Sequence, residues 1–130
     1  MIKLTFCLVR LPHLSRADFQ AYWRGTHAPL VASVAETLRI RRYVQMHSLP
    51  EEASAGIRAS RDAPAEYDGV AELWFDSLEA LAENGRRPEA QAAGAMLLED
   101  EKRFIDLPRS PLWWGQEHVI VEGSRPSLRI

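Results

Sequence analysis

Two hydrophobic periodicities alternate along this chain of 130 residues, and their order limits the possible folds more than any other feature. Alternation of apolar and polar residues predicts strands at 2–9, 40–48, 67–75 and 113–122. Apolar residues three and four positions apart predict helices after Ser15, after Ser77 (78–83) and from Pro88 onwards. The predicted order is strand, helix, strand, strand, helix, strand, with the second helix in two pieces.

This order predicts an α+β, ferredoxin-like βαββαβ fold, a four-stranded antiparallel sheet with the helices on one face. The length suits a single domain over residues 1–130, with a long loop at 49–66 and a polar tail at 124–130. A loop of that length is typical either of a mobile lid or of a disordered segment. Which side of each strand faces the helices stays open, because Val and Leu occur on both sides of the outer strands.

The first predicted helix contains a helix-breaking residue. Ser15 has the position of an N-cap, and the negative charge of Asp18 suits the helix N-terminus. Pro29 lacks an N–H group, and its ring presses on the carbonyl of Gly25. The sequence therefore predicts either a kink or a stop at His27 with a restart that has Pro29 in its first turn. For the last helix, the spacing predicts one side composed of Ala92, Ala95, Met96, Glu99 and Phe104.

Composition excludes several classes of protein. Sixteen basic and eighteen acidic side chains give a net charge of −2, without the positive field of a nucleic-acid-binding protein. RNA-recognition modules of the same topology carry a cation and stacking aromatics on the third strand, where this chain has Asp68, Val70 and Glu72. No apolar run approaches the roughly 20 residues of a membrane helix. Because Cys7 is the single cysteine, no internal disulfide can form. We expect no nucleic acid, no membrane and a cytoplasmic location.

Residues that bind metals or cofactors are scattered. The histidines His13, His27, His47 and His118 occur singly, without the close spacing of a metal site. The sequence also lacks a phosphate-binding loop, a dinucleotide-binding glycine motif and a serine nucleophile motif. We therefore predict no metal and no bound cofactor.

One string stands out as a candidate for chemistry, Phe19-x-x-Tyr22-Trp23-x-x-x-His27-Ala28-Pro29-Leu30-Val31. His27 follows Trp23 by four residues, so the two side chains lie on one face of the helix. A histidine beside aromatic side chains at a helix break can exchange protons near neutral pH. The alternative is a core histidine whose ring nitrogens bond to the backbone and fix the kink.

The same string resembles the signature of the EthD domain family, small proteins of the dimeric α/β barrel superfamily. The resemblance continues in four further segments, Arg42-Tyr43-Val44-Gln45-x-His47, Asp68-Gly69-Val70-Ala71-Glu72-Leu73-Trp74-Phe75, Phe104-Ile105-Asp106 and Glu117-His118-Val119-Ile120. It implies a homodimer in which the sheets of two ferredoxin-like subunits form a joint barrel, and a pocket near His27 in each subunit. Burial of Trp113 and Trp114 against a second subunit agrees with this expectation.

Related barrels include cofactor-free oxygenases, lactone isomerases and polyketide-modifying enzymes, so the fold alone does not fix the reaction. We interpret the chain as an enzyme that needs no cofactor and acts on a small hydrophobic or aromatic metabolite with His27 as acid or base. Isomerisation, dehydration and oxygenation all fit this interpretation. The alternative is a non-catalytic ligand-binding or accessory barrel protein of a degradation or biosynthesis pathway.

Seven further residues are predicted to shape the pocket or bind the substrate, namely Tyr22, Trp23, Tyr43, His47, Glu72, Trp74 and His118. The aromatic residues are expected in the wall, and the two histidines and Glu72 as its polar partners. Each polar group has a plainer alternative: core packing for the tyrosines, a strand edge or an interface for the histidines, and an exposed strand for Glu72. The more polar positions of the last three predicted strands are Arg41, Tyr43, Gln45, His47, Glu72, Trp74, Gln116 and His118. If these residues share one face of the sheet, that face is polar with aromatic patches.

Overall fold

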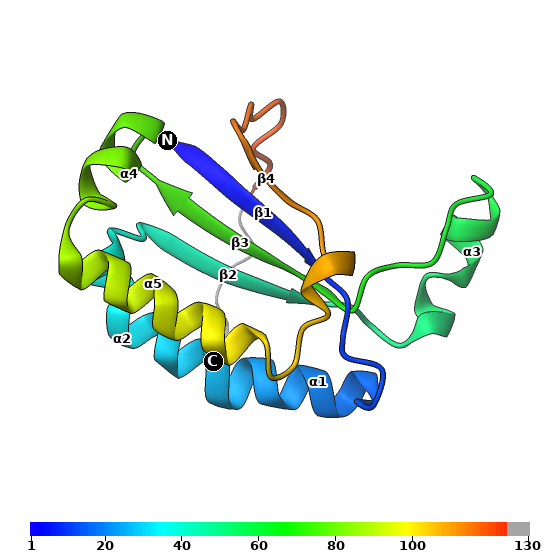
Figure 1. Ribbon diagram of the computed structural model, residues 1–130. Helices are drawn as coiled ribbons and strands as arrows, with labels where there is room; N and C mark the ends of the chain where they lie inside the picture. Colours follow the sequence, from blue (N-terminus) through cyan, green and yellow to red (C-terminus); the bar gives the residue numbers. More distant parts are fainter. Residues whose placement is uncertain (125–130) are drawn as a thin grey trace, which may run out of the picture.

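A computed structural model describes residues 1–124 and shows one four-stranded antiparallel sheet with helices against one face (Figure 1). The strand order is β2-β3-β1-β4, which is the ferredoxin-like arrangement that the sequence predicts. The strands are β1 (Ile2–Leu8), β2 (Arg42–His47), β3 (Gly69–Phe75) and β4 (Leu112–Gly115). The helices are α1 (Arg16–Tyr22), η1 (Trp23–His27), α2 (Ala28–Leu38), η2 (Glu51–Ala53), α3 (Ala55–Ala59), α4 (Leu78–Asn84), α5 (Pro88–Glu101) and η3 (Leu107–Arg109).

The strand register settles which residues face the helices. Leu4 of β1 pairs with Leu73, and Leu73 pairs with Tyr43 of β2, so these side chains share the helix-facing side. By the same alternation Gln45 and His47 lie on this side, whereas Glu72 and Trp74 lie on the opposite face of the sheet. The sequence left open whether both sets share one polar face, and they do not, because β2 and β3 pair in a register that places Val44 opposite Glu72.

The first helix runs from the Ser15 cap to Leu38 without a stop. The Ser15 hydroxyl accepts a hydrogen bond from the Asp18 amide at 3.0 Å, as the sequence predicts. At Trp23 the helix widens into the π-helical turn η1, in which the Ala28 amide reaches back five residues to the Trp23 carbonyl. This wider turn accommodates the Pro29 ring and its missing N–H group, so α2 continues directly with the proline in its first turn.

A close approach between helix and sheet fixes the position of this turn. The Trp23 ring is 1% exposed and lies directly over Gly69 at the start of β3. A Cβ atom on Gly69 would overlap both the Trp23 ring and the Met46 carbonyl. Glycine therefore lets η1 sit close against the sheet.

Two predictions about later elements are wrong. Helix α5 buries Ala90, Ala93, Leu97 and Asp100. Of the predicted side, Met96 is 38% exposed, and only Phe104, after the end of the helix, is buried. Strand β4 ends at Gly115, not at residue 122. Gly115 pairs with Lys3, and because β1 begins at Ile2, only one residue of β1 remains beyond this pair for a longer strand. Residues 116–124 form no strand, and 125–130 of the predicted tail lie outside the described residues.

Candidate functional site

A cavity of about 120 Å³ lies between the helix-facing side of the sheet and the helices η1, α2 and α5. Its wall is apolar apart from the titratable side chains of His27, Tyr43 and Glu101. The wall is made by Leu4, Phe6, Leu8, Trp23, His27, Val31, Tyr43, Ala71, Leu73, Leu97, Glu101, Ile105 and Leu112. An apolar hollow with a few polar groups is typical of a small-molecule site, and its volume suits a molecule with about one ring.

His27 is held by a carboxylate rather than by the backbone. Its Nδ1 lies 2.7 Å from Oδ2 of Asp100, and the ring is 5% exposed. The other oxygen of Asp100 accepts a hydrogen bond from the Tyr22 hydroxyl at 2.6 Å. Helix α5 thus supplies one buried carboxylate that joins α1 and η1. The expected alternative, a histidine bonded to its own main chain, is not what these residues form.

The protonation of Asp100 fixes the roles of the two His27 nitrogens. Burial opposes ionisation of Asp100, but the hydrogen bonds from Tyr22 and His27 outweigh it and lower the pKa of Asp100 below its ordinary value of 3.8. An ionised carboxylate only accepts hydrogen bonds, so Nδ1 carries the hydrogen and Nε2 keeps its lone pair in the neutral ring.

The Nε2 atom of His27 is open to the cavity. Within residues 1–124 it forms no hydrogen bond, and no fully buried side-chain nitrogen or oxygen there lacks a partner. Nε2 is therefore reached from the hollow that the ring lines. The Phe104 ring lies 5.0 Å from both the His27 and Tyr22 rings and closes the other side of the group.

On the sheet side, a chain of hydrogen bonds along β2 orients Tyr43. The Gln45 amide nitrogen donates to the Tyr43 hydroxyl at 2.8 Å and to the Trp23 carbonyl at 3.0 Å. The Gln45 oxygen pairs with Nε2 of His47 at 2.8 Å, and the His47 ring stacks on Trp23 with centroids 4.4 Å apart. Because the Tyr43 oxygen accepts from Gln45, its own O–H group is left to donate into the cavity.

Both titratable groups at the ends of this chain have shifted pKa values. Burial raises the pKa of Tyr43, and hydrogen bonds from Gln45 and Trp23 offset only part of the effect. Burial, together with the charge of Arg24, lowers the pKa of His47. Both groups therefore favour their neutral forms near neutral pH.

Sequence reasoning missed the two acidic residues of the site, Asp100 and Glu101. They are consecutive in the last turn of α5, yet Asp100 binds His27 while Glu101 lines the cavity. Burial, with the nearby charge of Asp100, raises the pKa of Glu101 to about 7. The available signal was the buried series Ala90, Ala93, Leu97, Asp100, whose three- and four-residue spacing puts an acid on an apolar side.

The predicted site residues divide into three groups. His27, Trp23 and Tyr43 line the cavity, whereas Tyr22 lies outside its wall and binds Asp100, the partner of His27. His47 lies behind Trp23, outside the cavity wall. The remaining three lie elsewhere, on the opposite sheet face or beyond β4, namely Glu72, Trp74 and His118.

On that opposite face, Trp74 is surrounded by charges. Its indole N–H donates to Glu117, and Lys3 and Arg42 lie over its ring at 5.2 and 4.6 Å. Glu72 lies 3.5 Å from Lys3. A role for these residues at the cavity has no support from their position, and their role in substrate binding stays a prediction.

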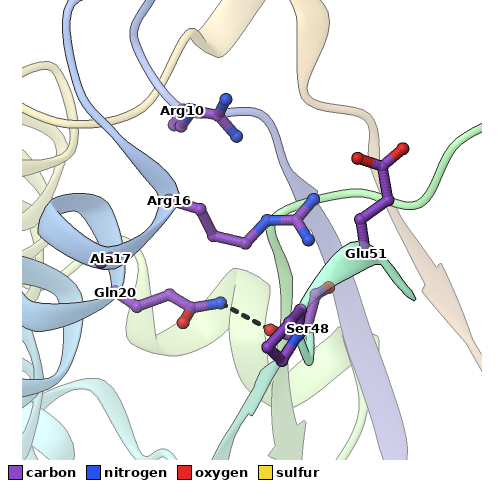
Figure 2. Close-up of a pocket in the computed structure, with 7 residues that line it drawn as sticks. Arg10, Arg16, Ala17, Gln20, Ser48 and Glu51 are labelled. Atoms are coloured by element: carbon purple, nitrogen blue, oxygen red, sulfur yellow. Dashed lines mark hydrogen bonds between the residues drawn. The ribbon is translucent and has the colours of Figure 1, made fainter. Parts of the chain in front are cut away.

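A second, more open hollow lies beside α1 and the segment that the sequence predicts as a loop at 49–66 (Figure 2). This segment contains η2 and α3 and extends away from the sheet (Figure 1). Arg16 reaches toward it and donates to Asp68, to the Leu49 carbonyl and to Glu66. Gln20 donates to the Ser48 carbonyl at 2.9 Å. Because the charged donors already have partners, this hollow anchors the segment rather than offering an anion site.

Two further classes of site find no support in residues 1–124. No cluster of three or more His, Cys, Asp or Glu side chains there could hold a metal ion. Among the same residues, no helix combines the length and the apolar character needed to span a membrane.

Comparison with known proteins agrees with this architecture. The EthD domain matches residues 11–108. An EthD family protein of Bacillus halodurans C-125 superposes with a TM-score of 0.58 at 20% identity, covering 91% of this chain and 100% of that one. A dimeric protein of unknown function and ferredoxin-like fold from Bacteroides fragilis NCTC 9343 gives 0.56 at 9% identity, covering 89% and 95%. SnoaB, a cofactor-independent oxygenase from Streptomyces nogalater, gives 0.51 at 11% identity, covering 94% and 96%. No curated protein matches the sequence.

Proposed function

The chain belongs to the EthD domain family, and we propose that it is a cofactor-independent enzyme with His27 as its acid/base group. The substrate is a small hydrophobic or aromatic molecule that enters the cavity under the helices. One observation carries this proposal: Nε2 of His27 opens onto an apolar cavity while Nδ1 is held by the buried Asp100.

The arrangement suits proton transfer. Nε2 takes a proton from the bound molecule, and the Asp100 carboxylate stabilises the imidazolium that forms, since the two side chains lie 2.7 Å apart. The Tyr22 hydroxyl fixes the second oxygen of Asp100 and so keeps the carboxylate in place. The Tyr43 O–H group is available to bind an oxygen atom of the substrate.

Several reaction types begin with such a proton transfer, including isomerisation, dehydration and the oxygenation of an electron-rich ring. The similarity in fold to SnoaB keeps oxygenation among them. A non-catalytic role in binding is the alternative that the experiment below decides.

A panel of one-ring phenols, lactones and enones, incubated with the protein in D₂O and followed by proton NMR, tests the proposal. We expect at least one compound to be converted or to exchange a carbon-bound proton, and His27→Ala to lower that rate by about 100-fold or more. Circular dichroism checks that the variant is folded. A His27→Ala rate equal to the parent rate would refute the role of His27, and binding without conversion would favour a binding protein.

We also propose that the protein is a homodimer that associates through the outer face of its sheet. That face exposes Met46 and Trp113, which are 54% and 51% exposed, and such apolar area is costly to leave in water. The similar fold from Bacteroides fragilis is dimeric. Light scattering should give the mass of two subunits, and Trp113→Lys should shift it towards one. A parent mass of one subunit would contradict this arrangement.

A further inference from the structure

Glu101 is a carboxyl group inside the cavity that the proposed chemistry of His27 leaves unused. We propose that Glu101 is a second acid/base group of the site, and that the substrate is an uncharged one-ring ketone in which a proton moves from one carbon to another. This inference deepens the proposed function and depends on it for the role of His27.

The position of Glu101 sets it apart from the neighbouring Asp100. Asp100 is 3% exposed and bound to Tyr22 and His27, so it has no room for a ligand. The Glu101 side chain lines the cavity and forms no hydrogen bond within residues 1–124. A carboxyl group that faces an apolar hollow without a partner is free to bind whatever enters.

The surroundings of Glu101 increase the share of its protonated form at neutral pH. Three titratable groups face it: Asp100 on its own helix, His27 on η1 and Tyr43 on β2. Burial raises the pKa of Glu101 to about 7, and the Asp100 charge adds to the effect. Burial raises the pKa of Tyr43, and the charge of Glu101 adds to this rise.

These groups match the chemistry of a ketone. Tyr43 has an O–H group that can donate to a carbonyl oxygen, because its own oxygen accepts from Gln45. His27 presents a lone pair at Nε2 that can accept a proton from the carbon beside the carbonyl group. An anionic substrate would lose its hydration against an apolar wall that contains no Lys or Arg, and about 120 Å³ leaves room for about one ring.

The reaction balances without an oxidant or reductant. His27 takes a proton from the carbon beside the carbonyl group, and the C–H electron pair forms an enolate whose oxygen is bound by Tyr43. Glu101 then gives its proton to a more distant carbon of the conjugated enolate, and the carbonyl group forms again. The imidazolium returns its proton to the Glu101 carboxylate through solvent, so each turnover removes one proton and adds one.

Cyclohex-3-enone is the probe, because movement of one proton from C2 to C4 gives cyclohex-2-enone with a measurable rise in ultraviolet absorbance. We expect the parent to accelerate this conversion above buffer, Glu101→Gln to lose about 100-fold of the rate, and Glu101→Asp to recover part of it. Glu99→Gln is the matched control, since Glu99 lies on the same helix, is exposed and binds Lys102. It should keep the parent rate.

The outcomes separate this inference from the proposed function. Two results overturn the inference: a parent protein that does not convert the probe, or a Glu101→Gln variant with the parent rate and pH profile. Neither result decides the role of His27, which the NMR panel tests separately. A His27→Ala variant with the parent rate, alongside a slow Glu101→Gln, overturns the role of His27 instead. Carbon-13 NMR gives a second check: the carboxyl signal that Glu101→Gln removes should titrate near pH 7, and titration near 4.5 overturns the inference.

Discussion

Two buried aspartates at different places in the chain show what separates a structural ion pair from a reactive one. Asp68, before β3, is 6% exposed and accepts hydrogen bonds from the Arg10 amide, the Arg10 guanidinium and Arg16. Asp100, in α5, is 3% exposed and accepts from Tyr22 and His27. Burial of the carboxylate is therefore nearly the same in both.

The difference lies in the partners. The partners of Asp68 are guanidinium groups that stay charged at any ordinary pH, and Arg16 uses its remaining donors on Leu49 and Glu66. The partner of Asp100 is the His27 imidazole, which keeps one ring nitrogen open to a cavity. A buried carboxylate thus indicates chemistry only where its partner has an unused atom and a space beside it.

The largest expected effect that sharpens this comparison is that of Asp100→Asn on activity. An Asn side chain can place its amide N–H group against Nδ1 of His27, which moves the ring hydrogen to Nε2 and removes the base from the cavity. We expect a loss of about 10²- to 10⁴-fold in the rate measured with any active compound of the NMR panel. Asp68→Asn, measured in parallel, should keep the parent rate per folded molecule. Equal losses in both variants would break the comparison.

The free energy of unfolding, unlike the rate, should fall more in Asp68→Asn than in Asp100→Asn. Asp68→Asn leaves Arg10 and Arg16 without their carboxylate, and breaking such a pair is costly where it is buried. Arg10 is 38% exposed and regains water, so we expect a loss of about 2 kcal/mol in the free energy of unfolding. Urea denaturation measures it. Asp76→Asn breaks the exposed pair with Arg41 at 2.7 Å and serves as the control, with a smaller effect than Asp68→Asn.

Glu101 extends the comparison to pH. The unfolded chain releases this proton near its ordinary pKa of 4.5, whereas the folded chain holds it to about 7. Between these values the folded state binds the extra proton, so the free energy of unfolding should fall as pH rises from about 5 to 8, by about 2 kcal/mol at most after allowance for partial exposure. Glu101→Gln should remove this decline. An identical pH dependence in parent and variant would show that Glu101 titrates normally.

The architecture follows from the sequence because local patterns determine it. Strand alternation, the Ser15 cap and the Pro29 break each act over a few residues, and the structure confirms the βαββαβ order they predict. The length of β4 does not follow, because it depends on where its partner β1 begins. In the same way, which side of β2 faces the helices depends on the register of β2 with β3, and the sequence leaves this register open.

Of the candidate site, the sequence predicted the part around His27 but not the acidic residues of α5. The aromatic string places His27 near Trp23 on one helix face, and the structure puts both in the cavity wall. Asp100 and Glu101 were missed because α5 contains four alanines that give its faces little contrast. Which acid meets His27 is set by the packing of α5 against η1, a contact between segments 73 residues apart.

The smallest expected effect concerns Arg16, which ties the Asp68 network to the 49–66 segment. Arg16→Gln loses the charged contacts to Asp68 and Glu66, at 3.1 and 3.4 Å, while Arg10 still holds Asp68. We expect a loss of about 1 kcal/mol in global stability, faster hydrogen exchange confined to 49–66, and an unchanged rate with any active compound. Arg61→Gln is a suitable control, because the Arg61 side chain bonds only to the neighbouring Ser60 hydroxyl among the described residues. Exchange that speeds up equally in both variants would mean that Arg16 does not anchor the segment. A lower rate in Arg16→Gln alone would instead connect the arginine network to the cavity and end the distinction between the two aspartates.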